Sequence, residues 1–197
     1  MRFKLLGTEF YISFLFAAVI TAMIAFDRTG YILPLLFAVL MHEGGHLAAM
    51  WILDCAPKRV RLVPASVEIT AKMTVSHKNE IAVALCGPFV NIILFITFGL
   101  NYLVYKRSLS LICCLINLLI AAFNLLPVRG LDGGTVLFSL LTCRKTPEKA
   151  ALTMRIINLS LAALVLFAAV YLCFHGKVNI SLFITALYLI VISIIKM

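Results

Sequence analysis

Long apolar stretches are the feature that most constrains how this chain can fold. Hydrophobic residues make up 63% of its 197 residues and charged residues only 13%, so a water-soluble fold would leave much apolar surface exposed. At 1.5 Å per residue, a helix needs about 20 residues to cross a hydrocarbon core of about 30 Å. We predict an all-α polytopic membrane protein with six transmembrane helices, in the stretches 10–26, 31–53, 81–104, 109–126, 152–174 and 178–195.

The second stretch contains the pentapeptide His42-Glu43-Gly44-Gly45-His46. Residues four apart share one face of a helix, so His42 and His46 can bind one metal ion together. Zinc in such a site lowers the pKa of its bound water to about 7, and the carboxylate of Glu43 can accept a proton from that water. The alternative is that these side chains only hold helices together. It is disfavoured because a carboxylate at bilayer depth is costly without a partner.

The fourth stretch ends in a segment, 124–134, that contains one proline and three glycines. Such a segment breaks a helix, and a break at membrane depth is tolerated where the backbone lines an enclosed or wet cavity. Helix rise places Asn124 about 7 Å and His46 about 10 Å from the same edge of the hydrocarbon core. Asp132 can therefore supply a third zinc ligand. The alternative for Asp132 is that it caps a helix that starts near Thr135.

Two further segments have a predicted structure. Residues 59–74 alternate polar and apolar side chains, which indicates a small β-hairpin on the cytoplasmic side; an irregular basic loop at the lipid headgroups is the open alternative. In the third stretch, residues 84–91 contain Gly87, Pro88 and Asn91. We interpret them as a packing seam against the second stretch, with Asn91 able to form a hydrogen bond between helices.

The net charge of +9 is best explained by membrane topology, because the basic residues lie at the ends of apolar runs. With both termini in the cytoplasm, thirteen of the seventeen Lys and Arg residues are cytoplasmic, as the positive-inside rule requires of a multi-pass protein. No basic block with interleaved aromatic residues is present, so we expect no nucleic-acid partner. The six Cys residues show no paired CxxC spacing, which disfavours a disulfide framework or a Cys-based metal site.

Three ordered motifs, His42 to His46, Ala84 to Asn91 and Asn124 to Gly134, resemble those of the site-2 protease family of intramembrane zinc metalloproteases. The phrase that begins at Asn124 and the six spans resemble the stage IV sporulation protein FB branch. The resemblance implies one zinc ion per chain, bound by His42, His46 and Asp132, with Glu43 as general base and Asn124 steadying the oxyanion. It also implies a membrane-associated protein substrate, such as a sporulation sigma-factor precursor, and a place in the bacterial cell membrane.

The resemblance is not complete. Thr135 stands where family members often have Arg, and the chain ends at Met197 directly after its sixth span. We therefore expect a single transmembrane protease domain over 1–197, with its catalytic core at about 31–143 and with neither a PDZ nor a CBS domain. A membrane-bound regulator or inhibitor and an oligomer are compatible with this interpretation.

Two other functions remain as alternatives. A small membrane metal transporter could use His42, His46 and Asp132 as a transit site, although it has no need for Glu43 between the histidines. A catalytically silent membrane-binding partner could retain the same fold, although the intact Glu43 counts against it.

Overall fold

The computed structural model describes residues 2–5, 8–63, 66–71, 76–175 and 180–195, most of which are helical. They form two compact units, Met1–Ala122 and Phe123–Met197. The prediction of one protease domain over the whole chain stays a prediction.

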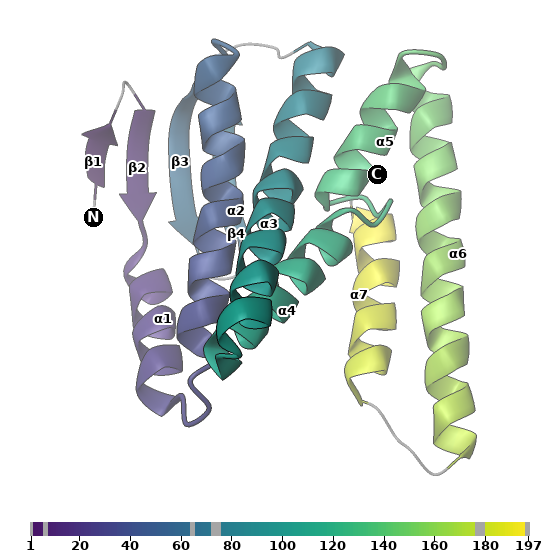
Figure 1. Cartoon of the computed structure of the whole chain (residues 1–197). Coiled ribbons are helices and arrows are strands. Elements are labelled where there is room, and N and C mark those ends of the chain that lie inside the picture. The colour runs from purple at the N-terminus through teal and green to yellow at the C-terminus, as the bar shows by residue number, and fades with distance from the viewer. Residues whose placement is uncertain (1, 6–7, 64–65, 72–75, 176–179, 196–197) are drawn as a thin grey trace. The chain divides into compact units, whose positions relative to one another are not determined.

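The first unit contains a four-stranded sheet, which corrects the all-α prediction. Strands β1 (Arg2–Leu5) and β2 (Thr8–Ile12) form an antiparallel pair, and β2 then runs parallel to β3 (Pro57–Val63), as Figure 1 shows. The last strand, β4 (Ser66–Ala71), pairs antiparallel with β3. The predicted hairpin over 59–74 is therefore confirmed in its described residues, while its cytoplasmic location stays a prediction.

The N-terminal strands explain why the first apolar stretch is not helical throughout. Residues 10–12 belong to β2, and helix α1 (Phe14–Phe26) begins only after Ser13, whose hydroxyl accepts a hydrogen bond from the Phe16 N–H at 3.0 Å. Glu9 of β2 forms an ion pair with Arg59 of β3 at 3.2 Å. The hydrogen bond from Arg59 and the nearby Lys4 lower the pKa of the Glu9 carboxyl, so this link between strands is charged at neutral pH.

Helix α2 (Ile32–Ile52) begins after a tight turn organised by Asp27. One carboxylate oxygen of Asp27 accepts hydrogen bonds from the N–H groups of Thr29 and Gly30, and the other accepts from the Ile32 N–H at 3.0 Å. The last of these bonds satisfies one of the donors that a helix N-terminus leaves unpaired. Gly30 has a φ of +73°, a conformation that glycine adopts at little cost.

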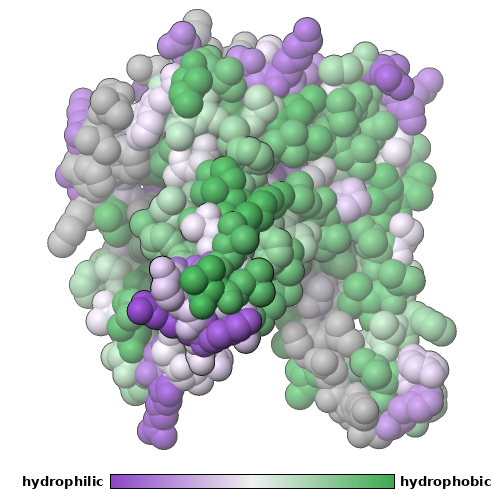
Figure 2. Space-filling view, in the orientation of Figure 1, coloured by the Kyte–Doolittle hydropathy of each residue, from purple (hydrophilic) through white to green (hydrophobic). Residues whose placement is uncertain are grey.

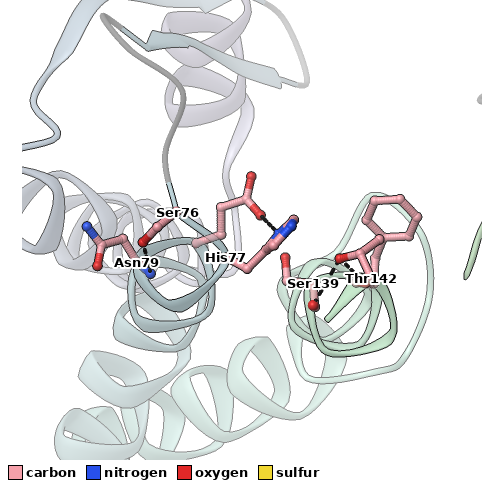
Figure 3. Close-up of polar contacts among 7 residues, drawn as sticks. Ser76, His77, Asn79, Ser139 and Thr142 are labelled. Carbon is pink, nitrogen blue, oxygen red and sulfur yellow. Dashed lines mark hydrogen bonds and ion pairs between the residues drawn. The ribbon is translucent and has the colours of Figure 1, made fainter. Parts of the chain in front are cut away.

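Helix α3 (His77–Tyr105) lies beside α2 in the first unit (Figure 1). Figure 3 shows its start, where the Ser76 hydroxyl accepts a hydrogen bond from the Asn79 N–H at 3.3 Å. The helix continues through Pro88 and ends at Tyr105, before Lys106, which adopts a left-handed conformation. Helix α4 (Ser108–Asn124) follows directly.

The second unit contains α5 (Asp132–Thr142), α6 (Pro147–Phe174) and α7 (Ile180–Ile195), with α6 and α7 side by side. The predicted helix break is confirmed, because α4 ends at Asn124 and α5 begins at Asp132. Near the end of α5, the Thr142 hydroxyl donates to the Ser139 carbonyl at 3.0 Å (Figure 3). The core of this unit combines residues of the loop before α5, of α6 and of α7: Val128, Leu131, Leu161, Ala162, Val165, Leu189 and Ile190.

Apolar side chains cover much of the surface shown in Figure 2, as expected for a surface that faces lipid. Among the described residues, α2, α3 and α6 are long and apolar enough to cross a membrane. Helices α1 and α4 are apolar but shorter, at 13 and 17 residues. The prediction of six membrane spans is thus supported for three helices and stays a prediction for the others.

Candidate metal centre

The segment from His42 to His46 lies in the middle of α2, on the face that packs against α3. Its two histidines are almost completely buried, with exposed fractions of 4% for His42 and 8% for His46. The other buried residues of that face are small: Ala38, Gly45 and Ala49. Small residues let two helix backbones approach closely in a membrane.

Two glycines make this close approach possible. A Cβ atom at Gly45 of α2 would lie 2.8 Å from the Cys86 carbonyl oxygen of α3. A Cβ atom at Gly87 of α3 would contact Nε2 of His46 and lie 2.9 Å from Cε1 of His42. The predicted packing seam at 84–91 is therefore present, and Gly87 presses its backbone directly against the two imidazole rings.

Each histidine uses its Nδ1 atom for a hydrogen bond to α3. The distance from His46 Nδ1 to the Val83 carbonyl oxygen is 2.8 Å, and that from His42 Nδ1 to the Asn91 side-chain oxygen is 2.6 Å. Both partners are oxygen acceptors, so both Nδ1 atoms carry the proton. In the neutral rings the Nε2 atoms are therefore unprotonated, which is the form that binds a metal.

The two Nε2 atoms face each other at 3.2 Å, with their rings nearly perpendicular at 87°. Two nitrogen lone pairs this close repel one another unless a cation lies between or beside them. The donor set of this buried pair therefore fits a zinc ion, which prefers imidazole nitrogen and bonds it at about 2.0–2.1 Å. The predicted sharing of one helix face by His42 and His46 is confirmed.

Asn91 does more than the sequence indicated. It is fully buried, and its amide nitrogen donates to the Ala38 carbonyl at 3.1 Å and to the Asn117 side-chain oxygen of α4 at 2.8 Å. Its oxygen accepts from His42. The predicted hydrogen bond of Asn91 between helices is therefore confirmed, whereas sequence reasoning missed Asn117. The cost of burying an amide in a membrane helix is the signal that could have identified Asn117 as well.

Glu43 follows His42 on α2 and is half-buried. Its neighbour Gly44 is exposed, and a Cβ atom there would meet nothing within 4 Å. Glu43 thus lies at the border between the buried face that carries the histidines and the open side of the helix. This position suits a carboxylate that must be held near a metal and still receive a proton.

Asp132 lies in the second unit, at the first residue of α5. The residue that caps α5 is Leu131, so the alternative of Asp132 as the helix cap is wrong. Carboxylates in the first helical turn are favoured by the helix dipole. The catalytic roles of Glu43 and Asn124 and the zinc-ligand role of Asp132 stay predictions.

The backbone of the loop before Asp132 makes the contacts that fix its conformation. The Arg129 N–H donates to the Asn158 side-chain oxygen of α6 at 3.2 Å, and Gly130 has a φ of +103°. A Cβ atom at Gly133 would clash with the Leu125 carbonyl, and one at Gly134 with the Val128 carbonyl. The Gly133-Gly134 pair is thus required so that the loop can fold back against the start of α5.

Comparisons with known proteins agree with the motifs. Residues 105–168 match the model of peptidase family M50. Stage IV sporulation protein FB of Bacillus subtilis strain 168 is 36% identical over 124 residues, or 60% of this chain and 43% of that protein. The chain thus spans less than half the length of this curated relative.

Among solved structures, the site-2 protease from Methanocaldococcus jannaschii aligns with a TM-score of 0.65 at 21% identity. The alignment covers 98% of this chain and 93% of that chain. At this level of identity the match shows the fold. Together with the three long apolar helices, these similarities identify an integral membrane protein and confirm the resemblance stated from the three motifs.

Proposed function

We propose that this chain, which resembles the site-2 proteases of peptidase family M50, hydrolyses a peptide bond of a membrane-associated protein. The observation that carries the proposal is the buried His42 and His46 pair, whose unprotonated Nε2 atoms lie 3.2 Å apart. Together with Asp132, these two histidines would hold one zinc ion. Three protein ligands and one open position are typical of catalytic zinc sites.

Zinc, when bound, polarises the scissile carbonyl and makes a water molecule acidic enough to react at neutral pH. Glu43, directly beside His42, accepts a proton from the attacking water and delivers it to the leaving amine. The Asn124 amide donates a hydrogen bond to the carbonyl oxygen as negative charge develops there. Glu43 thus acts as the general base, zinc as the Lewis acid, and Asn124 as the hydrogen-bond donor to the oxyanion.

The position of Asn124 on α4 supports its role. Asn117 of the same helix donates and accepts hydrogen bonds in the buried network that reaches His42. Asn124 lies seven residues further, close to two helical turns, so a regular helix carries both amides on one face. The side of α4 that Asn117 presents to α3 is therefore the side that carries Asn124.

The membrane arrangement follows the charge distribution. Both termini lie in the cytoplasm, because this arrangement places thirteen of the seventeen basic residues there. Cleavage takes place near the cytoplasmic face of a bacterial cell membrane. The substrate is a membrane-associated precursor protein, and the similarity to a sporulation protein favours a sigma-factor precursor.

The two other functions account for less of the site. A metal transporter requires further polar groups along a transmembrane path, and the predicted motifs provide one site. A catalytically silent binding partner requires neither Glu43 nor unprotonated Nε2 atoms on both histidines. A protease requires all of these groups.

The metalloprotease function is tested with the purified chain in liposomes, using the native protein and Asp132→Ala. We expect Asp132→Ala to lose both zinc and cleavage, because the zinc ligands fall from three to two. Zinc content is measured by elemental analysis and cleavage by gel electrophoresis of a co-reconstituted membrane substrate. Glu148→Ala, which removes an exposed carboxylate in the first turn of α6, is the matched control. Full zinc occupancy of Asp132→Ala would contradict the ligand assignment.

Substrate binding requires hydrogen-bond partners for an unwound peptide backbone, and the sheet can provide them. A peptide bond inside a helix cannot be cleaved, so the substrate must unwind, and its backbone N–H and C=O groups then need partners. Among the described strands, β4 pairs only with β3, which leaves its other edge open to an added strand. The substrate therefore pairs with β4 in an extended conformation.

Proline at Ile69 of β4 tests this pairing. Proline lacks a backbone N–H and disturbs the strand, so Ile69→Pro should raise KM or abolish cleavage while zinc remains bound. Ile69→Val, which preserves the strand, should behave like the native chain. Both are compared by steady-state cleavage in liposomes. Native activity of the proline variant would rule out strand addition at β4.

A further inference from the structure

The histidine pair obtains its metal-binding form in two different ways. The Nδ1 proton of His46 is accepted by a backbone carbonyl, that of Val83. The Nδ1 proton of His42 is accepted by the side chain of Asn91. A backbone carbonyl can only accept, whereas an amide side chain presents either an oxygen or an NH₂ group, depending on its orientation. Which ring nitrogen of His42 carries the proton therefore depends on the groups that orient the Asn91 amide.

The orientation of Asn91 is determined by acceptors on two other helices. Its NH₂ group donates to the Ala38 carbonyl of α2 at 3.1 Å and to the Asn117 side-chain oxygen of α4 at 2.8 Å. A rotated amide would place its oxygen against these two oxygens and leave the NH₂ group facing His42. The Asn91 oxygen is thus directed at His42 by its neighbours.

Asn117 is oriented in turn by the backbone of its own helix. Its NH₂ group donates to the Cys113 carbonyl at 2.8 Å, one helical turn earlier, so its oxygen faces Asn91. Asn91 and Asn117 both have an exposed fraction of 0%. Because both amides are fully buried, each must find its partners within the protein.

We propose that Asn117 and Asn91 form a polarity relay that holds His42 with its proton on Nδ1 and its lone pair on Nε2. The relay starts at the Cys113 carbonyl, is reinforced by the Ala38 carbonyl, and ends at His42. Asn91 and Asn117 are positioning residues that act through His42. The inference rests on the proposed function in that the Nε2 lone pair serves to bind zinc.

An asparagine suits this place better than a carboxylate would. Aspartate at position 91 could accept from His42 but could not donate to Ala38 or Asn117, and it would bury a further negative charge. The neutral amide satisfies all three neighbours at once. Partners that orient a metal-ligating histidine commonly change metal affinity by about 10- to 100-fold when they are removed.

The test compares Asn91→Leu with the control Asn101→Leu. The control removes another hydrogen bond between α3 and α4, the 2.6 Å bond from the Ser110 hydroxyl to Asn101, without touching His42. The zinc dissociation constant is measured by competition with a chromogenic chelator. We expect it to rise about 10- to 100-fold in Asn91→Leu and to stay native in Asn101→Leu. Equal weakening in both variants would overturn the relay in favour of general helix packing.

A spectroscopic readout separates the relay from a structural role. In metal-free protein labelled with ¹⁵N-histidine, NMR distinguishes a proton on Nδ1 from one on Nε2. We expect His42 to shift toward the Nε2-protonated form in Asn91→Leu, while His46, held by Val83, stays unchanged. An unchanged His42 would overturn the proposal. If leucine prevents folding, Asn91→Ala removes the acceptor without added bulk and is judged by the same two outcomes.

Asn117 is tested through its dependence on Asn91. Asn117→Leu should weaken zinc binding less than Asn91→Leu, because the Ala38 carbonyl still orients Asn91. The double variant with Asn91→Leu and Asn117→Leu should bind zinc as weakly as Asn91→Leu alone, since Asn117 acts on His42 through Asn91. If the two substitutions weakened zinc binding additively, the relay would be overturned. A native chain that binds no zinc would instead refute the proposed function, and the tautomer measurement would still judge the relay.

Discussion

Replacing Glu43 with Gln is expected to slow peptide cleavage by about 10²- to 10⁴-fold while the protein keeps its zinc, because general base catalysis contributes an effect of that size. The substitution keeps the length and shape of the side chain and removes its ability to accept a proton. His42 and His46 remain in place, since their Nδ1 atoms bond to α3 rather than to Glu43. Cleavage rate and zinc content are measured on the same purified sample.

The control for this substitution is Glu80→Gln. Glu80 lies in the first turn of α3, where its carboxylate oxygen is 3.3 Å from Nδ1 of His77, and we expect native cleavage when it is changed. Cleavage that persists at the native rate in Glu43→Gln would remove Glu43 from the chemistry. A native chain that binds zinc, transports it across liposomes and cleaves no membrane protein would favour the transporter alternative.

Adding a single methyl group at Gly87 is expected to weaken zinc binding severely. The new Cβ would contact Nε2 of His46 and lie 2.9 Å from Cε1 of His42. Neither ring can move aside easily, because each is held at Nδ1 by a buried acceptor on α3. We expect Gly87→Ala to weaken zinc binding by about 100-fold or more, beyond the usual effect of altering a ligand's orientation, and to abolish cleavage although every ligand is still present.

Gly99 provides the matched control on the same helix. A Cβ atom there would lie 3.5 Å from the Cys114 sulfur, an ordinary contact, so Gly99→Ala should keep native zinc binding and cleavage. The zinc dissociation constants of both variants are measured by chelator competition. Tight zinc binding by Gly87→Ala would mean that α2 and α3 can separate enough to admit the methyl group, which would contradict the close packing described above.

The sequence determined the local part of the site. The spacing of His42 and His46 was enough to predict that they share a helix face, because an α-helix repeats every 3.6 residues whatever surrounds it. Proline and glycine were enough to predict the break between α4 and α5, since their backbone preferences are also local. The hairpin of β3 and β4 was predictable from alternation over adjacent residues, and residues 72–74 of that prediction lie outside the described residues.

Pairings between distant segments were decided only by the tertiary structure. Strand β2 lies parallel to β3, with Glu9 opposite Arg59, so residues 10–12 became strand although their composition fits a membrane helix. A partner 50 residues away supplied the hydrogen bonds that made the strand favourable. Local propensity carries no information about such a partner.

The protonation of the histidines was decided in the same way. The sequence supplied two imidazoles at the right spacing, but it did not indicate which nitrogen of each ring carries the proton. Val83 and Asn91 decide that, at separations of 37 and 49 residues from the histidines they contact. The choice depends on which acceptor lies within hydrogen-bond distance of Nδ1, and only the packing of α3 against α2 brings those acceptors there.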